Sequence, residues 1–347
     1  LVTYPFMEWL NEPALPLGSP SDTLVTAENR LITDTEAVLG EIAARFEADM
    51  GVYYPEVGGR RPWGYLWAVT LPCQECGHRF PLVTSLELRR ASTRKGKGTS
   101  IPVVDPGQSF RVVADPASGL FRIEVDDHEA TGSPTFASPL GPDGKKVKGK
   151  AAICPFCGHS HALAVHQRLA QERLGEDALL LVVEHDDVFG RHFRLPTGDE
   201  TAVLPGATAA LATEPPFGRL LPAVPNEVIP ENNGATIRPQ LYGASDYGDL
   251  MVDRQTLSYV RLSRILNDLA QELVGAGLST EYVASLMGYA SSTMVRMLKF
   301  STRGAKLRTT LGAGLVDHIY ANEGTISFSY DFFEVGLSDG PGSWLMM

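Results

Sequence analysis

Residues 73–78 read CQECGH and residues 154–159 read CPFCGH, so the pattern C-x-x-C-G-H occurs twice in the chain. Two thiolates three positions apart can hold one ion from a tight turn, and a glycine after the second cysteine allows the positive φ of such a turn. Two of these turns supply the four soft ligands of a closed tetrahedral zinc site. The motifs use all 4 cysteines of the chain. The predicted metal ligands are Cys73, Cys76, Cys154 and Cys157.

The separation of the two motifs predicts an unusual zinc ribbon. Between Cys76 and Cys154 lie 77 residues, whereas two such cysteine pairs are usually about 15–20 residues apart. We therefore expect the two turns to lie side by side across an inserted β region, joined by the metal. Because structural zinc contributes about 10–16 kcal/mol of apparent binding free energy, it is expected to organise this region. Four thiolates leave no position for water, so the site is predicted to be structural and not catalytic.

Other interpretations of these motifs stay open. Iron also suits a four-thiolate site and is the minor alternative to zinc. The four cysteines could also be unrelated thiols or form two disulfides, although a cytoplasmic location disfavours disulfides. Four nearby histidines are expected to be ordinary turn residues, because four cysteines already complete the site: His78, His159, His161 and His166.

Composition excludes several classes of protein. With 44% hydrophobic and 20% charged residues among 347, the chain can build a substantial core and is not globally disordered. It has no run of about 18 apolar residues and no signal-peptide layout at its start, which predicts a cytoplasmic protein with no membrane span. A formal net charge of −11 argues against nucleic-acid binding over the whole surface but allows local basic patches.

Hydrophobic spacing predicts the main elements and an α+β fold, in which a β-rich four-cysteine zinc-ribbon insertion is flanked by helical regions. Helices are expected at about 31–50, 162–173, 254–274 and 280–300, the last with Ser279 or Thr280 as its N-cap. Strands are expected before the first cysteine pair, at 109–114 and 120–125 as a hairpin, and at 179–183. The Pro/Gly/Ala-rich residues 196–239 are interpreted as a long connector. The predicted regions are 1–66 (loop and helix), 67–205 (zinc ribbon) and 206–347 (connector and C-terminal helices).

Two basic stretches lie near the cysteine motifs in sequence and are the candidate DNA-binding segments. Flexible Lys/Arg loops in an otherwise acidic protein can track phosphates. The alternative is that they are solvated hairpin tips, and neither stretch has interleaved aromatic residues for base stacking. The candidate residues are Arg89, Arg90, Arg94, Lys95, Lys97, Lys145, Lys146, Lys148 and Lys150.

Most catalytic signatures are missing from the sequence. It has no G-x-G-x-x-G and no phosphate-binding P-loop. An amino-methyltransferase needs an Asp-or-Asn, Pro, Pro, aromatic tetrapeptide; residues 214–217 read EPPF, with Glu in the first position, and no Asp- or Asn-led form is present. The acidic pairs at 126–127 and 186–187 are expected in surface turns. No catalytic residue is predicted.

The order of several short segments resembles the zinc-ribbon-containing adenine-specific DNA methylases, a family with an N-terminal domain of unknown function. The similarity runs along nearly the whole chain. In that family a Gly-rich donor-binding motif precedes such a segment and a Pro-Pro-Tyr catalytic tetrapeptide follows it. This chain has neither, so it resembles the intervening segment, as its lack of an initiator Met also suggests. The matching segments are Tyr54-Pro55, 64–68 (GYLWA), 80–82 (FPL), 154–158 (CPFCG), 247–251 (YGDLM) and Arg254-Gln255.

The resemblance implies S-adenosylmethionine as the cofactor and N6-adenine methylation of DNA as the activity of the parent enzyme. It implies a segment that is inactive alone, that assists DNA recognition, and whose partners are DNA and the rest of the methylase on the same or another chain. The alternative is a free-standing zinc-ribbon adaptor that binds a partner protein through the helical third. Some relatives suggest a place in anti-phage defence.

Overall fold

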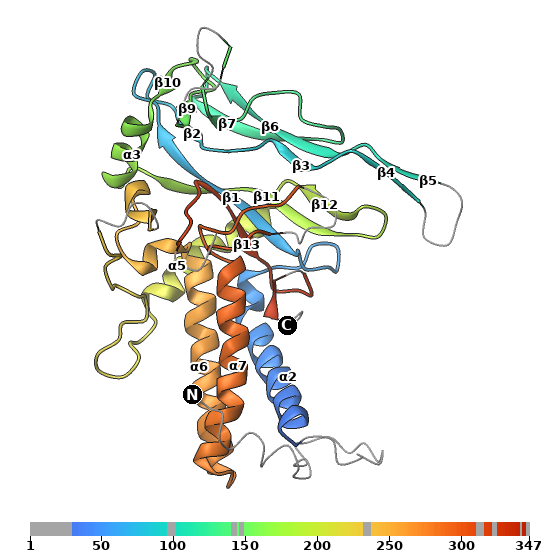
Figure 1. Cartoon of the computed structure of the whole chain (residues 1–347), viewed down its shortest axis with the longest axis vertical. Coiled ribbons are helices and arrows are strands. Elements are labelled where there is room, and N and C mark those ends of the chain that lie inside the picture. Colours follow the sequence, from blue (N-terminus) through green and yellow to red (C-terminus); the bar gives the residue numbers. More distant parts are fainter. Residues whose placement is uncertain are drawn as a thin grey trace.

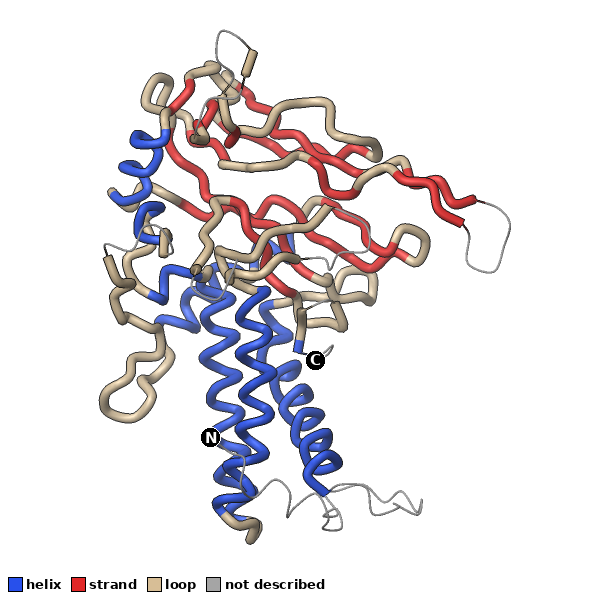
Figure 2. The backbone as a smooth tube through the Cα atoms, in the orientation of Figure 1, coloured by secondary structure: helices blue, strands red, loops and turns tan. Residues whose placement is uncertain are grey.

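The computed structural model describes residues 30–95, 102–139, 144–145, 149–231, 237–309, 316–320, 325–340 and 342–344. The predicted α+β class is confirmed. Long helices form one half of the molecule and layered strands form the other (Figure 1; Figure 2). None of the helices in these ranges is both long enough and apolar enough to cross a membrane.

Three helices pack together in the helical half: α2 (Arg30–Met50), α6 (Asp253–Gly275) and α7 (Thr280–Phe300) (Figure 1). The predicted helices are confirmed to within about one residue at each end. Ser279 is the N-cap of α7, because its side chain accepts a hydrogen bond from the backbone N–H of Tyr282 at 3.3 Å. Arg45 on α2 reaches both carboxylate oxygens of Glu272 on α6, at 2.7 and 2.8 Å.

The central sheet has the strand order β12-β11-β1-β13, all antiparallel, with β2 paired to the far end of β1. Its strands are β1 (Gly64–Pro72), β2 (Arg79–Pro81), β11 (Glu176–Asp186), β12 (Gly190–Arg194) and β13 (Asp331–Val335). β1 is buried along almost its whole length, which explains its aromatic and β-branched sequence. The expectation that the last third is helical is incomplete, because β13 from that third pairs with β1.

The inserted β region forms smaller sheets beyond the central one. β6 (Gln108–Asp115) and β7 (Leu120–Asp126) form the predicted hairpin, with β3 (Glu87–Arg89) on the other side of β6. β4 (Ser92–Lys95) and β5 (Pro102–Asp105) make a hairpin that extends away from this layer (Figure 1). The second cysteine motif lies in a three-stranded sheet of β8 (Phe136–Ala137), β9 (Ala151–Ile153) and β10 (Ser160–His161).

The connecting segments are more ordered than the sequence predicts. The predicted helix near 162–173 is α3 (Leu163–Gln171), but the expected connector at 196–239 begins with α4 (Gly198–Ala202) and α5 (Leu204–Ala212). Thr197 and Glu200 cap α4 reciprocally, and the buried Glu200 carboxylate also binds Arg194 at 2.7 and 2.8 Å. The remaining short turns are η1 (Gly51–Tyr53), η2 (Pro239–Tyr242) and η3 (Tyr247–Leu250).

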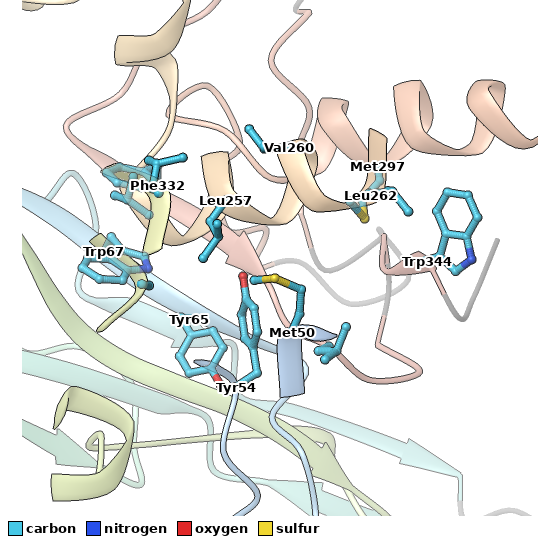
Figure 3. Packing of buried hydrophobic residues seen from close by; sticks show 14 of the residues in the cluster. Met50, Tyr54, Tyr65, Trp67, Leu257, Val260, Leu262, Met297, Phe332 and Trp344 are labelled. Carbon is cyan, nitrogen blue, oxygen red and sulfur yellow. The ribbon is translucent and has the colours of Figure 1, made fainter. Parts of the chain in front are cut away.

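One ion pair is sealed inside the core. Arg254 donates to the Glu334 carboxylate at 2.7 and 2.9 Å, and the two side chains are 1% and 0% exposed. Trp67 Nε1 and the Tyr54 hydroxyl also donate to Glu334, at 2.7 and 2.8 Å. The guanidinium lies 4.1 Å from the centre of the Tyr65 ring. The three aromatic side chains lie together in the core (Figure 3). Glu334 is therefore fully partnered, as a buried carboxylate must be.

This core cluster joins residues from three of the short segments that carry the family resemblance. Tyr54 precedes the first strand, Tyr65 and Trp67 lie in β1, and Arg254 begins α6. Burial, and then the charge of Glu334, raises the pKa of Tyr54, so its hydroxyl stays protonated and donates. Removing one partner of a buried ion pair typically costs about 3–5 kcal/mol. The segments are therefore held to one another by a structural requirement of the core.

Candidate metal centre

The two cysteine motifs form matching turns. In the first, Cys73 N donates to His78 O at 2.9 Å, and Gly77 N donates to Cys73 O at 2.8 Å. In the second, the corresponding bonds from Cys154 N and from Gly158 N are both 2.9 Å. Gly77 and Gly158 each have φ of 76°, the left-handed conformation that glycine adopts without a Cβ penalty. The repeated sequence pattern thus encodes the same local turn twice.

Each turn lies at the tip of a short antiparallel pair, which brings the four thiols together. The first turn connects β1 to β2, and the second connects β9 to β10. Cys73 Sγ lies 3.7 Å from Cys157 Sγ, and Cys76 Sγ lies 3.7 Å from Cys154 Sγ. All four sulfur atoms lie within 4.8 Å of one another. The predicted set Cys73, Cys76, Cys154 and Cys157 is therefore a single cluster.

The sulfur separations fit a tetrahedral metal site. A metal–sulfur bond of about 2.3 Å gives a tetrahedron whose sulfur–sulfur edge is about 3.8 Å. A disulfide requires a sulfur–sulfur distance of about 2.05 Å, and all four cysteines are free thiols. The donor set and its spacing suit zinc or another thiophilic ion.

The four thiols lie in different environments. Burial raises the pKa of Cys73 and of Cys154, which opposes deprotonation in the absence of a cation. Burial acts in the same direction on Cys76, but hydrogen bonds from the backbone of His78 and from the neighbouring thiols lower the pKa of Cys76 overall. Cys157 is exposed. A bound cation would offset the cost of holding buried thiolates here.

His161 is a neighbour of this cluster that the sequence does not mark. The sequence predicts an ordinary turn residue, but His161 is buried, and its Nε2 lies 3.4 Å from Cys73 Sγ. An N–H group at this distance supports a thiolate, as partners of metal ligands commonly do. Burial, and then the nearby His159, lowers the pKa of His161. His78 contacts Phe156 of the other turn, with ring centres 4.9 Å apart.

The prediction that Arg89 binds DNA is wrong. Its side chain is buried, it pairs with Asp105 at 2.7 Å, and it donates to the carbonyl of Arg191 at 2.6 Å. Its guanidinium also lies over the ring of Phe189, 4.6 Å from the centre. Because these contacts use the charge and the donors inside the β region, Arg89 ties strands together and cannot meet a phosphate.

The other predicted basic residues lie in two places. Arg90, Arg94 and Lys95 are exposed along the β4 side of the projecting hairpin, although Arg90 pairs with Glu87 and Arg94 donates to the carbonyl of Val188. Lys145 and Lys150 are exposed near the second cysteine turn. Three predicted residues lie outside the described residues: Lys97, Lys146 and Lys148.

Lys150 belongs to a cluster that no local motif indicates. It lines one cavity together with Arg238 and Lys306, which come from distant parts of the chain. Aromatic residues line the same cavity, whereas the sequence around Lys150 has none interleaved with the basic residues.

Comparison with known proteins gives no match to any family model, to any curated protein or to any solved structure.

Proposed function

We propose that the four cysteines hold a structural zinc ion and that the chain is the zinc-organised, DNA-engaging segment of an adenine-specific DNA methyltransferase. The observation that carries the proposal is the meeting of four thiols from two distant segments at tetrahedral spacing. Cys73, Cys76, Cys154 and Cys157 would be the ligands, and the zinc would supply charge and cross-linking without chemistry of its own.

The role of the zinc in this proposal is to join two parts of the fold. One ligand pair is at the end of β1, in the central sheet, and the other is in the small sheet β8–β10. Those three strands are only two or three residues long, and such short strands are marginal on their own. A metal cross-link of about 10–16 kcal/mol would fix them to the central sheet.

The DNA part of the proposal rests on the exposed cations of the β half. Arg94 and Lys95 lie on the hairpin that extends from this half, and Lys150 lies close to the second cysteine turn. In a chain of net charge −11, a local group of exposed cations favours the β half as the side that faces phosphates. Methyl transfer itself, with S-adenosylmethionine, is assigned in this proposal to the parent enzyme.

One preparation can test both parts of the proposal. We expect elemental analysis to give one zinc per chain, and the zinc-loaded chain to bind fluorescein-labelled duplex DNA with an affinity that falls steeply between about 50 and 200 mM salt. Chelation, or the pair of substitutions Cys73→Ser and Cys154→Ser, should abolish metal uptake. A metal content near zero after refolding with zinc would contradict the metal site, and no binding at low salt would contradict the DNA role.

The adaptor function remains the second candidate because of one surface. Tyr289 and Val295 on α7 are 40% and 52% exposed, and an apolar cavity of about 270 Å³ opens beside Val295. Large exposed apolar side chains beside an apolar cavity are typical of protein contacts. If Val295→Glu abolished association with a co-purifying protein while DNA binding was absent, the adaptor function would replace the methylase function.

A further inference from the structure

A cleft opens where three segments meet: the chain before β9, the η2 turn and the chain before β13. Its volume is about 590 Å³. Three cations line it, Lys150, Arg238 and Lys306. In a chain with 41 acidic and 30 basic residues, three cations around one cavity oppose the average charge, and such a concentration of one sign is typical of a site for the opposite charge.

Two of these cations lack an ion-pair partner among the described residues. Within the described part of the chain, neither Lys150 nor Lys306 forms an ion pair with a carboxylate. Lys150 Nζ lies over the Phe136 ring, 5.2 Å from its centre. Loss of water around Lys150 against this wall, and then the charge of Lys306, lowers the pKa of Lys150. The two ammonium groups therefore repel one another across the cleft, and an anion bound between them would relieve this repulsion.

Among the described residues, Asp331 is the carboxylate whose charge acts on Lys150, and its oxygens are hydrogen-bonded to other groups. Asp331 accepts hydrogen bonds from the backbone N–H of Thr84 at 2.8 Å and from the Thr84 hydroxyl at 2.6 Å. The Ser329 hydroxyl donates to its other oxygen at 2.8 Å. These bonds hold Asp331 as part of the cleft wall. Asp331 forms no ion pair with Lys150 or Lys306, so a ligand can supply the anion that binds between the two ammonium groups.

An aromatic ledge lies beside the cations. The rings of Tyr242 and Phe328 are stacked in parallel, with centres 5.3 Å apart and an angle of 4° between their planes, and both are half-buried. Buried Tyr330 packs its ring against both, at 87–89°. The stacked pair thus has a fixed support, and a third planar ring can extend it.

Buried His166 holds the two walls of the cleft together. Its Nε2 lies 3.2 Å from the carbonyl oxygen of Lys150, which can only accept, so Nε2 carries the proton. Its Nδ1 lies 3.2 Å from the Tyr330 hydroxyl. Burial lowers the pKa of His166, which favours this neutral form. Because Lys150 directly precedes β9 and β9 leads into Cys154, the second cysteine turn also positions this wall.

We propose that the cleft binds a nucleotide, with the phosphate between Lys150 and Lys306 and the base stacked on the ledge of Tyr242 and Phe328. Cations without an ion-pair partner can bind a phosphate. A partly exposed aromatic pair can stack against any base, whatever the sequence. Only an unpaired nucleotide offers a free ring face, so the ligand is a free nucleotide or one nucleotide of a single strand. This inference rests on the proposed DNA-engaging function and deepens it.

Binding to a fluorescein-labelled 12-nucleotide single strand, measured by anisotropy on the zinc-loaded full chain, tests the cleft. The double variant Lys150→Gln/Lys306→Gln should bind about tenfold or more weakly, and its salt slope should be smaller by about 0.7 for each phosphate that is no longer neutralised. Tyr242→Leu should weaken binding by about 5- to 150-fold without changing that slope. The matched control Arg219→Gln/Arg296→Gln removes the same charge from exposed positions outside the cleft and outside the predicted DNA-binding set, and it should change binding less.

Circular dichroism and melting of each variant show that it is folded. A deoxynucleoside monophosphate added as competitor separates the two sources of the ligand. Displacement by the monophosphate supports a free nucleotide as occupant, and binding of the 12-mer without such displacement supports a strand. Cleft variants that bind both probes like the wild type would overturn the cleft and leave the DNA-engaging function standing. Binding of the monophosphate alone, with no binding of any DNA, would support the cleft and overturn that function.

Discussion

The core cluster and the cleft each place a cation against an aromatic ring, and they differ in whether a carboxylate pairs with that cation. In the core, Arg254 lies against Tyr65 and is neutralised by Glu334 at 2.7 Å, with both charged groups sealed from water. In the cleft, Lys150 lies against Phe136 and faces Lys306 with no carboxylate partner among the described residues.

This difference in pairing distinguishes a structural cation from one that can bind a ligand. A buried charge must be paired to be tolerated, so a complete cluster such as that of Arg254 has nothing left to offer a ligand. Cations that lack an ion-pair partner at the mouth of a cavity keep their capacity to bind an anion. A cation beside an aromatic ring therefore stabilises the core at Arg254, whereas at Lys150 it forms a candidate binding surface.

The largest expected effect follows removal of the metal, which should loosen the wall of the cleft and leave the core cluster ordered. Chelation of zinc should remove hydrogen-exchange protection from residues 151–161 and from the adjoining cleft wall, because a structural zinc contributes about 10–16 kcal/mol. Amides in the first turns of α6, next to Arg254, should keep most of their protection, because that cluster needs no metal ligand. Exchange mass spectrometry with and without chelator measures both, and unchanged exchange at 151–161 would contradict a structural metal.

The core ion pair provides the next largest effect. Glu334→Gln should lower the free energy of unfolding by about 3–5 kcal/mol, because it leaves the Arg254 charge buried and unpaired. The control Glu272→Gln breaks the exposed pair with Arg45 and should lower the free energy of unfolding far less, because solvent screens that pair. Denaturant unfolding compares them. The double variant Arg254→Met/Glu334→Leu should be less destabilised than Glu334→Gln, and a greater loss in the double variant would show that the pair is itself a net source of stability.

A smaller effect is expected from His166, which should make the stability of the chain fall as the pH is lowered. Because burial lowers the folded-state pKa of His166, its contribution to stability is complete above the unfolded value of about 6.5 and is lost as the pH falls from there through the lower folded pKa. His166→Gln, which cannot titrate, should flatten the stability curve of the zinc-loaded chain between about pH 5 and 7. Parallel curves for wild type and variant would mean that His166 does not set this slope.

The smallest expected effect is at Lys150. Lys150→Gln should change the free energy of unfolding by no more than about 0.5 kcal/mol, and toward greater stability, because it removes repulsion from Lys306. Thermal melting without nucleotide measures this. A loss of stability comparable to that of Glu334→Gln would mean that Lys150 is a structural cation like Arg254, and the contrast between the two clusters would disappear.

Local patterns were enough to predict several elements and the cysteine set. The three long helices follow from apolar residues at helical spacing, and the β6–β7 hairpin follows from two alternating runs around a turn. The start of the segment 196–239 was predicted to be a connector but is helical. Its Pro/Gly/Ala content indicated a loop, although Thr197 and Glu200 form a capping pair that begins a helix. The strand at 331–335 was not predicted, because a run of five residues becomes a strand only when β1 lies beside it.

The sequence by itself determined the two identical turns and the four thiols, because a C-x-x-C-G-H turn depends on residues within six positions of one another. Only the tertiary structure decided that the turns meet, that Arg89 is buried, and that Lys150 and Lys306 line the same cavity. Those outcomes depend on segments about 80 to 160 positions apart, whose contacts are set by packing of the sheets and not by any local pattern. The physical reason is that the environment of a charge, and therefore its role, is a property of its neighbours in space.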